Sequence, residues 1–274
     1  MLRLTELRLP LDHDEAALRA AVLARLGLPP AELHACTVAR RAWDARRRSS
    51  ISLTYSVDIA VADAAALLAR HAGDRHLGPT PYTTYRPIGH APAGFATSGP
   101  ARRPVVIGTG PCGLFAGLIL AQMGFRPLIL ERGRVVRQRT KDTWGLWRRG
   151  VLDPDSNVQF GEGGAGTFSD GKLYSQISDS RHYGRKVLTE FVKAGAPAEI
   201  LTVAHPHIGT FRLVSMVEHV RAAIEALGGE YRFGCKVADL DLDASRQLRG
   251  VVLEGGEHLA ADHVVLAIGH SARD

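Results

Sequence analysis

The sequence has few cysteines and no long apolar run. Its three cysteines, Cys36, Cys112 and Cys235, are far apart, and no C-x-x-C pair exists. A flavin reductase that works through a dithiol and a disulfide needs two neighbouring thiols, so this chemistry is excluded. No stretch approaches the ~20 apolar residues of a membrane span, and the N-terminus lacks the apolar region of a signal peptide. We therefore expect a cytoplasmic protein with no membrane partner.

Metal-ligand patterns are also missing. His205 and His207 are separated by one residue and have no obvious carboxylate nearby in the sequence. Structural zinc sites use other spacings and more ligands. We therefore predict no metal site, and we expect a structural or substrate-side role for these two histidines.

The most informative stretch runs from Pro104 to Gly133 and predicts a strand, a glycine turn, a helix and a second strand. A short apolar run, typical of a buried parallel strand, precedes a G-x-G-x-x-G motif formed by Gly108, Gly110 and Gly113. The first glycine permits a sharp turn, the second lets a pyrophosphate approach the backbone, and the third lets helix and strand pack closely. This pattern predicts a dinucleotide site.

The elements after the motif support this interpretation. The expected helix, Leu114 to Met123, directs its N-terminal N–H groups at the phosphate position. The second strand ends at Glu131, which lies 131 − 113 = 18 residues after the third glycine. A carboxylate at that distance hydrogen-bonds a ribose in dinucleotide-binding folds. An ordinary βαβ unit whose glycines serve only packing is the alternative.

A second glycine cluster, NVQFGEGGAGTFSDGK, spans residues 157–172. Glycine weakens both helices and strands, so the run predicts a loop laid close against a flat or anionic ligand. A flexible surface loop is the alternative, but Phe160, Phe168, Leu173 and Tyr174 bracket the run and favour an ordered one. Because a flavin must be held far from its adenosine end, two such loops favour FAD over a nicotinamide alone.

These motifs resemble a bacterial family of FAD-dependent proteins, also described as NAD(FAD)-utilizing dehydrogenases, among the glutathione-reductase-like flavoproteins. The resemblance covers nearly the whole chain. The motifs that carry it are ERG at 131–133, RTKD at 139–142, NVQFGEGGAGTFSDGKL at 157–173, PHIGT at 206–210 and LAIGHSARD at 266–274.

By position, the resemblance implies that Arg139 lies near the phosphates, that Gly163 to Asp170 lie near the flavin, and that Val237 meets the adenine through its backbone. Family members usually carry an aspartate where Phe211 stands, so no polar role is expected there. From the motifs and the resemblance together, the predicted cofactor-binding residues are Gly108, Gly110, Pro111, Cys112, Gly113, Glu131, Arg132, Arg139, Gly163, Gly164, Thr167, Ser169, Asp170, Val237 and Gly269.

Cys112, Lys172, His207 and His270 are the side chains with a possible chemical role. We expect Cys112 to be a small residue beneath the pyrophosphate; a thiol activated at a helix start is the alternative. Lys172 is a candidate for a charge near the flavin ring, and His207 and His270 are candidates for substrate contact. No catalytic residue is assigned more firmly.

The net charge of +6 permits anionic ligands. FAD, with NADH or NADPH as electron donor, would satisfy it without nucleic acid. Only one G-x-G-x-x-G is visible, so a separate nicotinamide domain is not expected in these residues.

The first 90 residues predict a separate small domain. Residues 51–61 alternate between apolar and polar, as in a strand with one wet face. Another strand is expected at 2–9, helices at 14–26 and 63–72, and a last strand near Tyr85. The order βαββαβ predicts a ferredoxin-like α+β domain. Proline, glycine, alanine and serine are frequent after Pro87, so 91–103 is read as a linker.

The run RRAWDARRR, Arg40 to Arg48, lies between the middle strands of that domain. One interpretation is a nucleic-acid patch in which arginines meet phosphates and Trp43 stacks on a base. The other, which we prefer, is a solvated hairpin tip in an arginine-rich chain. We therefore expect no nucleic-acid partner.

Together these patterns predict an α/β protein with a Rossmann-type FAD-binding domain at 104–274. The resemblance implies further sequence beyond HSARD, so we expect this chain to be truncated. The expected function is an FAD-dependent oxidoreductase that transfers a hydride or electrons on an unidentified substrate. A flavin-dependent RNA-modifying enzyme and a catalytically incomplete FAD-binding fragment are the alternatives.

Overall fold

The computed structural model describes residues 1–46, 50–95, 103–175 and 177–273. Arg47 and Arg48 of the basic run, most of the expected linker and Asp274 lie outside these ranges. The chain divides into two compact units. Unit 1 comprises 1–85, 173–188 and 197–206, and unit 2 comprises 86–172, 189–196 and 207–274.

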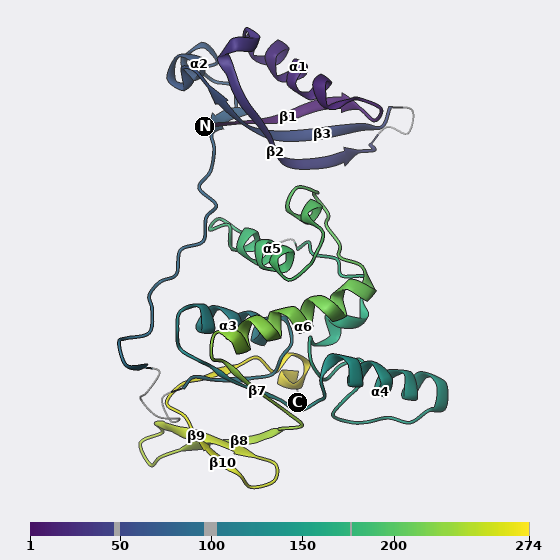
Figure 1. Ribbon diagram of the computed structural model, residues 1–274, viewed down its shortest axis with the longest axis vertical. Coiled ribbons are helices and arrows are strands. Elements are labelled where there is room, and N and C mark those ends of the chain that lie inside the picture. The colour runs from purple at the N-terminus through teal and green to yellow at the C-terminus, as the bar shows by residue number, and fades with distance from the viewer. Residues whose placement is uncertain (47–49, 96–102, 176, 274) are drawn as a thin grey trace. The chain divides into compact units, whose positions relative to one another are not determined.

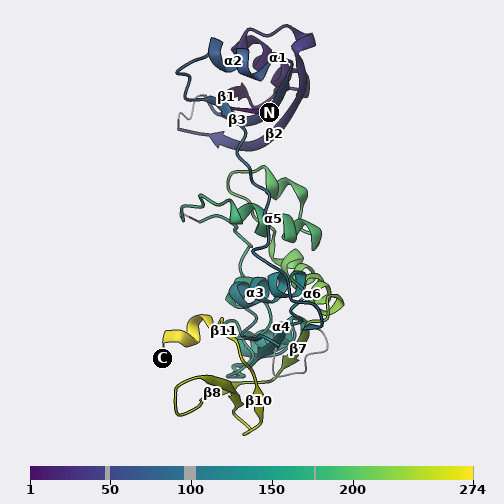
Figure 2. The ribbon, with the colours of Figure 1, turned by 90° about the vertical axis from the view of Figure 1, so that its left-hand side faces the viewer.

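Unit 1 contains a four-stranded antiparallel sheet in the order β2-β3-β1-β4. Figures 1 and 2 show helices α1 and α2 on one face of this sheet. The elements are β1 (Leu2–Pro10), α1 (Glu15–Leu26), the short helix η1 (Pro30–Glu32), β2 (Leu33–Asp44), β3 (Ser52–Val61), α2 (Ala64–Arg70) and β4 (Leu77–Pro79).

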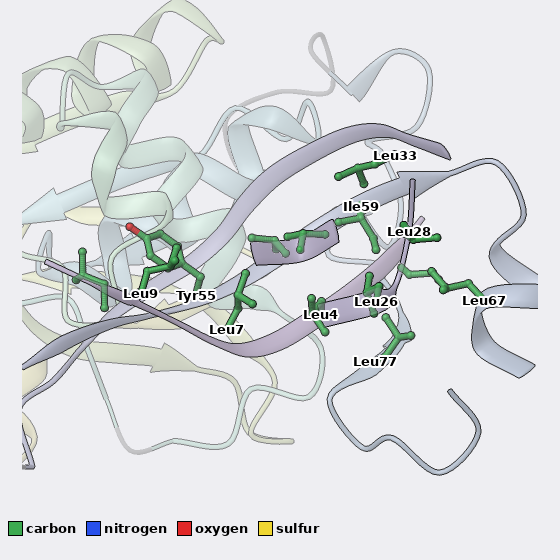
Figure 3. Close-up of a cluster of buried hydrophobic side chains, with 14 residues drawn as sticks. Leu4, Leu7, Leu9, Leu26, Leu28, Leu33, Tyr55, Ile59, Leu67 and Leu77 are labelled. Carbon is green, nitrogen blue, oxygen red and sulfur yellow. The ribbon is translucent and has the colours of Figure 1, made fainter. Parts of the chain in front are cut away.

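Local signals in the sequence fix these elements. The alternating residues of β3 place Leu53, Tyr55, Val57 and Ile59 in the core. Helix α1 begins after Asp14, whose carboxylate accepts a hydrogen bond from the backbone N–H three residues later. Figure 3 shows the resulting cluster, in which side chains from both helices meet those of the sheet. Burial of this apolar face is the main stabilising contribution to the unit.

The last strand of this sheet lies earlier than predicted. The expectation of a strand near Tyr85 is wrong, because β4 occupies Leu77–Pro79 and no strand follows it before residue 86. Leu77 is buried and anchors the strand to the core. Pro79 and Pro81 lack the backbone N–H that a longer ladder would need.

Two later segments join unit 1, whereas the sequence placed them in the second domain. Val203 forms a parallel bridge with Arg41, and Arg41 exchanges backbone hydrogen bonds with Thr202 (2.7 Å) and Ala204 (2.9 Å). This isolated bridge joins residues 202–204 to β2 within the basic run. Such pairing between residues far apart in sequence leaves no periodic signal to predict it.

Unit 2 contains a four-stranded parallel sheet in the order β11-β5-β6-β7. The chain is thus mixed α/β with a parallel sheet. The main elements are β5 (Val105–Ile107), α3 (Pro111–Gln122), β6 (Leu128–Glu131), α4 (Val136–Arg149), η4 (Ala165–Phe168), α6 (Thr210–Ala226), β7 (Glu230–Phe233), β11 (Val264–Leu266) and η6 (Gly269–Arg273). Helix α5 (Tyr183–Lys193) extends across the boundary between the units' segments, and η5 (Ala198–Leu201) belongs to unit 1.

The parallel sheet is covered on both faces. Helices α3 and α6 lie on one face, where Gly117 approaches Ile129 and Ile224. An antiparallel meander covers the other face, where Val251 packs against Val105 and neighbouring strand residues. Its strands are β8 (Val237–Leu242), β9 (Leu248–Leu253) and β10 (His258–Ala260). Coverage on both faces explains why the short parallel strands are so apolar.

Two short strands complete the ordering of unit 2. A turn at Gly234, with a φ of 66°, separates β7 from β8. Strand β11 has only three residues, Leu266 in it is exposed, and it pairs in parallel with β5.

None of the helices within the described ranges has the length and apolar character needed to cross a bilayer.

Candidate functional site

A cavity of about 460 Å³ opens at the carboxyl ends of the parallel strands in unit 2. Ile107 at the end of β5, Glu131 at the end of β6 and Ala267 just after β11 all line it. In open α/β sheets, ligands bind outside the carboxyl ends of the strands. Its volume falls within the ~300–1,000 Å³ range of ligand pockets.

The two glycine motifs meet at this cavity. A Cβ added at Gly164 would lie 2.8 Å from Gly110 Cα, and Gly164 has a φ of +65°. The Gly163 N–H also donates to the Thr109 carbonyl oxygen at 3.0 Å. Both Gly110 and Gly164 line the cavity, so a ligand there would contact bare backbone from two distant parts of the chain.

Glu131 is 5% exposed and is held by protein donors. Its Oε2 accepts hydrogen bonds from the Thr109 backbone N–H (2.9 Å) and Oγ1 (2.6 Å). Its Oε1 accepts from the backbone N–H groups of Gly133 (2.9 Å) and Gly161 (3.1 Å). The carboxylate thus joins both glycine motifs, and a ribose hydroxyl would have to share these oxygens or displace a donor.

Arg139 does not line the cavity, contrary to the expectation that it lies near phosphates. It is fully buried, and its guanidinium donates to the carbonyl oxygens of Asn157, Val158, Glu162 and Gly164 at 2.7–2.8 Å. Burial lowers its pKa to about 10. The role of Arg139 is to hold the second glycine loop in one conformation, because its donors are already used by backbone carbonyls.

Glu162 fixes the same loop from another side. Its fully buried carboxylate accepts from the Val136 backbone N–H at 2.7 Å, at the start of α4, and from Arg221 Nε of α6 at 2.8 Å. Burial raises the pKa of Glu162, and these two hydrogen bonds oppose the increase. The loop is therefore an ordered part of unit 2, tied to two helices.

Arg132 lies at the rim of the cavity. Its guanidinium stacks 4.2 Å from the centre of the Phe160 ring, and its Nε donates to Asp155 at 2.7 Å. Both contacts hold a cation and an aromatic ring at the cavity wall. The end of β6 therefore places a stacked guanidinium and aromatic ring, with the guanidinium paired to Asp155, next to the Glu131 carboxylate.

The structure brings about half of the predicted cofactor residues together. Those that line the cavity are Gly108, Gly110, Pro111, Glu131, Arg132, Gly164, Val237 and Gly269. Those that do not line it are Cys112, Gly113, Arg139, Gly163, Thr167, Ser169 and Asp170. Thr167 is buried beside Arg139, whereas Ser169 and Asp170 are exposed.

Cys112 lies in the first turn of α3, which begins at Pro111, and it is exposed. Gly113 has the predicted packing role, since a Cβ there would meet the Gly108 carbonyl oxygen.

None of the candidates for catalysis or substrate contact, Lys172, His207 and His270, is among the residues that line the cavity. Lys172 and His207 form an antiparallel backbone bridge, and both side chains are exposed. Lys172 Nζ lies 3.5 Å from Asp170. His270 is exposed in η6. Phe211 is 94% exposed at the start of α6.

Several cavity residues were missed by the sequence analysis. Thr109 occupies the variable position inside G-x-G, and Gln159, Phe160 and Lys236 line the wall. Of these, only Thr109 could have been predicted from the sequence. It lies inside the G-x-G motif, and the motif turn brings it next to Glu131 at the end of the following strand. Within the described ranges, no cluster of three or more His, Cys, Asp or Glu side chains is placed to hold a metal ion.

By sequence, this chain is similar to one domain family and to one bacterial protein. A domain of unknown function, DUF8436, matches residues 1–60. An uncharacterized protein of Clostridium beijerinckii is 37% identical over 273 residues, which is 100% of this chain and 49% of that protein. The chain thus spans about half the length of this relative.

The similar solved structures match less than two thirds of this chain. Thermovibrio ammonificans THI4 has 21% identity and a TM-score of 0.42, over 62% of this chain and 58% of that one. A 3-ketosteroid-delta4-(5alpha)-dehydrogenase of Rhodococcus jostii has 16% identity and a TM-score of 0.39, over 65% and 48%. OTEMO in an FAD-bound form has 18% identity and a TM-score of 0.38, over 63% and 26%. TM-scores of this size describe partial superpositions.

Proposed function

We propose that this chain is the FAD-binding part of an FAD-dependent oxidoreductase. The observation that supports it is the meeting of Gly110 and Gly164 at the carboxyl edge of the parallel sheet. Any side chain at either position would fill the space where backbone faces the cavity. A cofactor with a pyrophosphate fits this cradle, because it requires close approach to backbone N–H groups.

The chain's own groups would divide the binding as follows. The first turn of α3, which begins at Pro111, presents its N–H groups and positive dipole end to the pyrophosphate. Glu131 lies at the ribose position, and Val237 borders the opposite wall. The cofactor, when bound, supplies hydride or electron transfer, while these residues set its position.

Three finer assignments belong to this proposal. The strand order β2-β3-β1-β4 supports a ferredoxin-like domain in unit 1, because helix α1 connects β1 to β2 and helix α2 connects β3 to β4. NADH or NADPH is the proposed electron donor. Lys172 is proposed as a charge near the flavin ring, and His207 is proposed to contact the substrate. An unchanged reduction potential and an unchanged reoxidation rate in Lys172→Ala would contradict the role of the lysine.

The first experiment is the visible absorption spectrum of the purified chain before and after addition of FAD, followed by anaerobic addition of NADH or NADPH. A flavin spectrum that bleaches with a nicotinamide supports an oxidoreductase. Flavin binding without bleaching supports a binding fragment that lacks part of the reaction machinery. A folded chain that takes up no FAD contradicts the proposal.

The variant Gly110→Ala separates binding from folding. A Cβ at this position meets only ordinary contact, 3.8 Å from Gly164 Cα, and the backbone φ of −65° suits alanine. We expect a stable protein whose FAD affinity falls at least tenfold, because the methyl group occupies the phosphate approach. Gly255→Ala, which adds a methyl group in open space, is the matched control. Equal FAD affinity in both variants would contradict the assignment.

A further inference from the structure

A second cavity, of about 530 Å³, lies along the outer side of α4 in unit 2. One wall is a single face of the helix, with Gln138, Lys141, Asp142, Gly145 and Arg149 spaced by three or four residues. The other wall is the segment 151–154, which returns beside the helix after its end. This cavity shares no lining residue with the candidate cofactor site.

The returning segment is fixed by hydrogen bonds. Gly150 ends α4 with a φ of 69°, and its N–H donates to the Leu146 carbonyl at 2.9 Å. The Asp153 carboxylate accepts from the backbone N–H groups of Asp155 (3.0 Å) and Ser156 (3.1 Å). The cavity therefore has two ordered walls.

The acidic groups of the cavity are already paired. Arg134 lies 3.1 Å from Asp142 and 3.4 Å from Asp153. Asp142 also accepts hydrogen bonds from Gln138 (3.1 Å) and from Ser156 (2.7 Å). Arg134 thus pairs with both carboxylates. The two other cations that line the cavity are not needed to balance them.

Those cations are Lys141 and Arg149. In the part of the chain that the structure describes, neither makes an ion pair or a side-chain hydrogen bond. A Cβ at Gly145 would lie 3.3 Å from Arg149 Nη2, so the guanidinium lies across this glycine and into the cavity. A glycine inside a helix is costly relative to alanine, and here it gives space to the guanidinium.

The cavity also has an apolar end. Val151 and Leu152 line it and are 61% and 58% exposed. Counting Arg134, Lys141 and Arg149 against Asp142 and Asp153, its net charge is 3 − 2 = +1. A ligand that fits these groups has one negative charge beside an apolar group.

We propose that this cavity binds an organic monoanion, a carboxylate attached to an alkyl or similar apolar group. Lys141 and Arg149 receive the carboxylate, and Val151 and Leu152 contact the apolar group. The same chemistry is offered by a free small acid and by the C-terminus of a peptide that ends in an apolar residue. The proposal does not depend on FAD binding, because the two cavities are separate.

The test is a ligand-detected NMR titration of the full chain with three probes. N-acetyl-leucine carries the carboxylate and the apolar group, N-acetyl-leucinamide has the same shape without the charge, and octanoate is a free acid. We expect N-acetyl-leucine to bind at least tenfold more tightly than its amide, because charge-assisted hydrogen bonds contribute this much. Tighter binding of octanoate than of N-acetyl-leucine favours a free acid, and the reverse order favours a peptide terminus.

Variants connect this binding to the cavity. Lys141→Ala and Arg149→Ala are each expected to weaken N-acetyl-leucine about tenfold. Arg148→Ala is the matched control, because Arg148 is the adjacent arginine of α4 and stacks over Trp144 at 4.4 Å instead of lining the cavity. Equal affinity for acid and amide, or equal weakening by all three variants, would overturn the proposal. Circular dichroism of each variant verifies that the fold is retained.

Discussion

Thr109 Oγ1 donates a 2.6 Å hydrogen bond to Oε2 of Glu131, inside the candidate cofactor site. Thr109 is fully buried and also donates its backbone N–H to the same oxygen. The residue between the first two glycines of the motif therefore fixes the carboxylate at the end of the next strand. This contact sets the orientation of Glu131 before any ligand arrives.

Thr109→Val keeps the shape of the side chain and removes the hydroxyl donor. We expect the free energy of unfolding to fall by about 1–3 kcal/mol, because a buried carboxylate oxygen loses a hydrogen bond. Thr109→Ser retains the hydroxyl and should lose less. Urea unfolding followed by circular dichroism measures both, and equal losses in the two variants would show that the hydroxyl is not responsible.

Arg139 and Arg137 form a matched pair on α4 for testing how the second glycine loop is held. Arg139→Met should lower the free energy of unfolding by about 3 kcal/mol or more, because four loop carbonyls lose a buried donor. Arg137 is exposed and pairs with Glu218 at 2.7 Å, so Arg137→Met should change the stability far less than Arg139→Met does, because solvent screens an exposed ion pair. The measurement is urea unfolding, and similar losses for both variants would refute the loop-holding role.

The sequence predicted best the elements whose burial follows a simple period. The alternation of β3 and the glycine motif before α3 were both visible, because one buried face or one turn requires a fixed residue pattern. Helix α4 was not predicted. Its buried positions include Arg139, Thr143 and Gly145, and its tryptophans are exposed, so its apolar pattern does not indicate which face is buried.

The second glycine loop of the candidate site was also only partly predictable from the sequence. Its ordered character was predicted from the glycines and the aromatic residues around them. Ser169 and Asp170, two of its polar side chains, are exposed. Buried hydrogen bonds to the loop come from Arg139, which lies 18 residues before Asn157 and donates to the Asn157 carbonyl. A contact at that sequence distance has no local signal.

Lys236 tests the electrostatics of the proposed cofactor cavity. It lines the wall and pairs with Glu254 at 2.7 Å, and its side chain is 37% exposed. If FAD binds as proposed, Lys236→Ala should weaken its affinity by about three- to tenfold, since a cation near a diphosphate is lost. The loss should shrink at high salt, because salt screens the interaction.

Lys193→Ala is the control for this prediction. Lys193 is a 65% exposed lysine of unit 2 that pairs with Glu190 at 2.9 Å and does not line the cavity. Fluorescence titration of FAD at low and at high salt compares the two variants. An equal affinity in both, or a Lys236→Ala loss that is insensitive to salt, would contradict an electrostatic role for Lys236.

Arg3 and Asp58 join neighbouring strands of unit 1 through two hydrogen bonds of 2.8 Å. The Arg3 guanidinium lowers the pKa of Asp58 below its usual value of 3.8. Because the folded-state pKa is lowered, the carboxylate contributes stability above about pH 3.8, and this contribution is lost as pH falls through the folded-state pKa. The pair is partly exposed, so its coupling free energy should be no more than about 1 kcal/mol at pH 7.

A double-mutant cycle with Arg3→Met and Asp58→Asn isolates this coupling. Hydrogen exchange of the β1 and β3 amides measures it for unit 1 alone, at pH 7 and at decreasing pH below 4. The coupling should decline as the pH falls, because a protonated Asp58 no longer attracts the guanidinium. A coupling of the same size at every pH would mean that the two side chains interact through packing instead of charge.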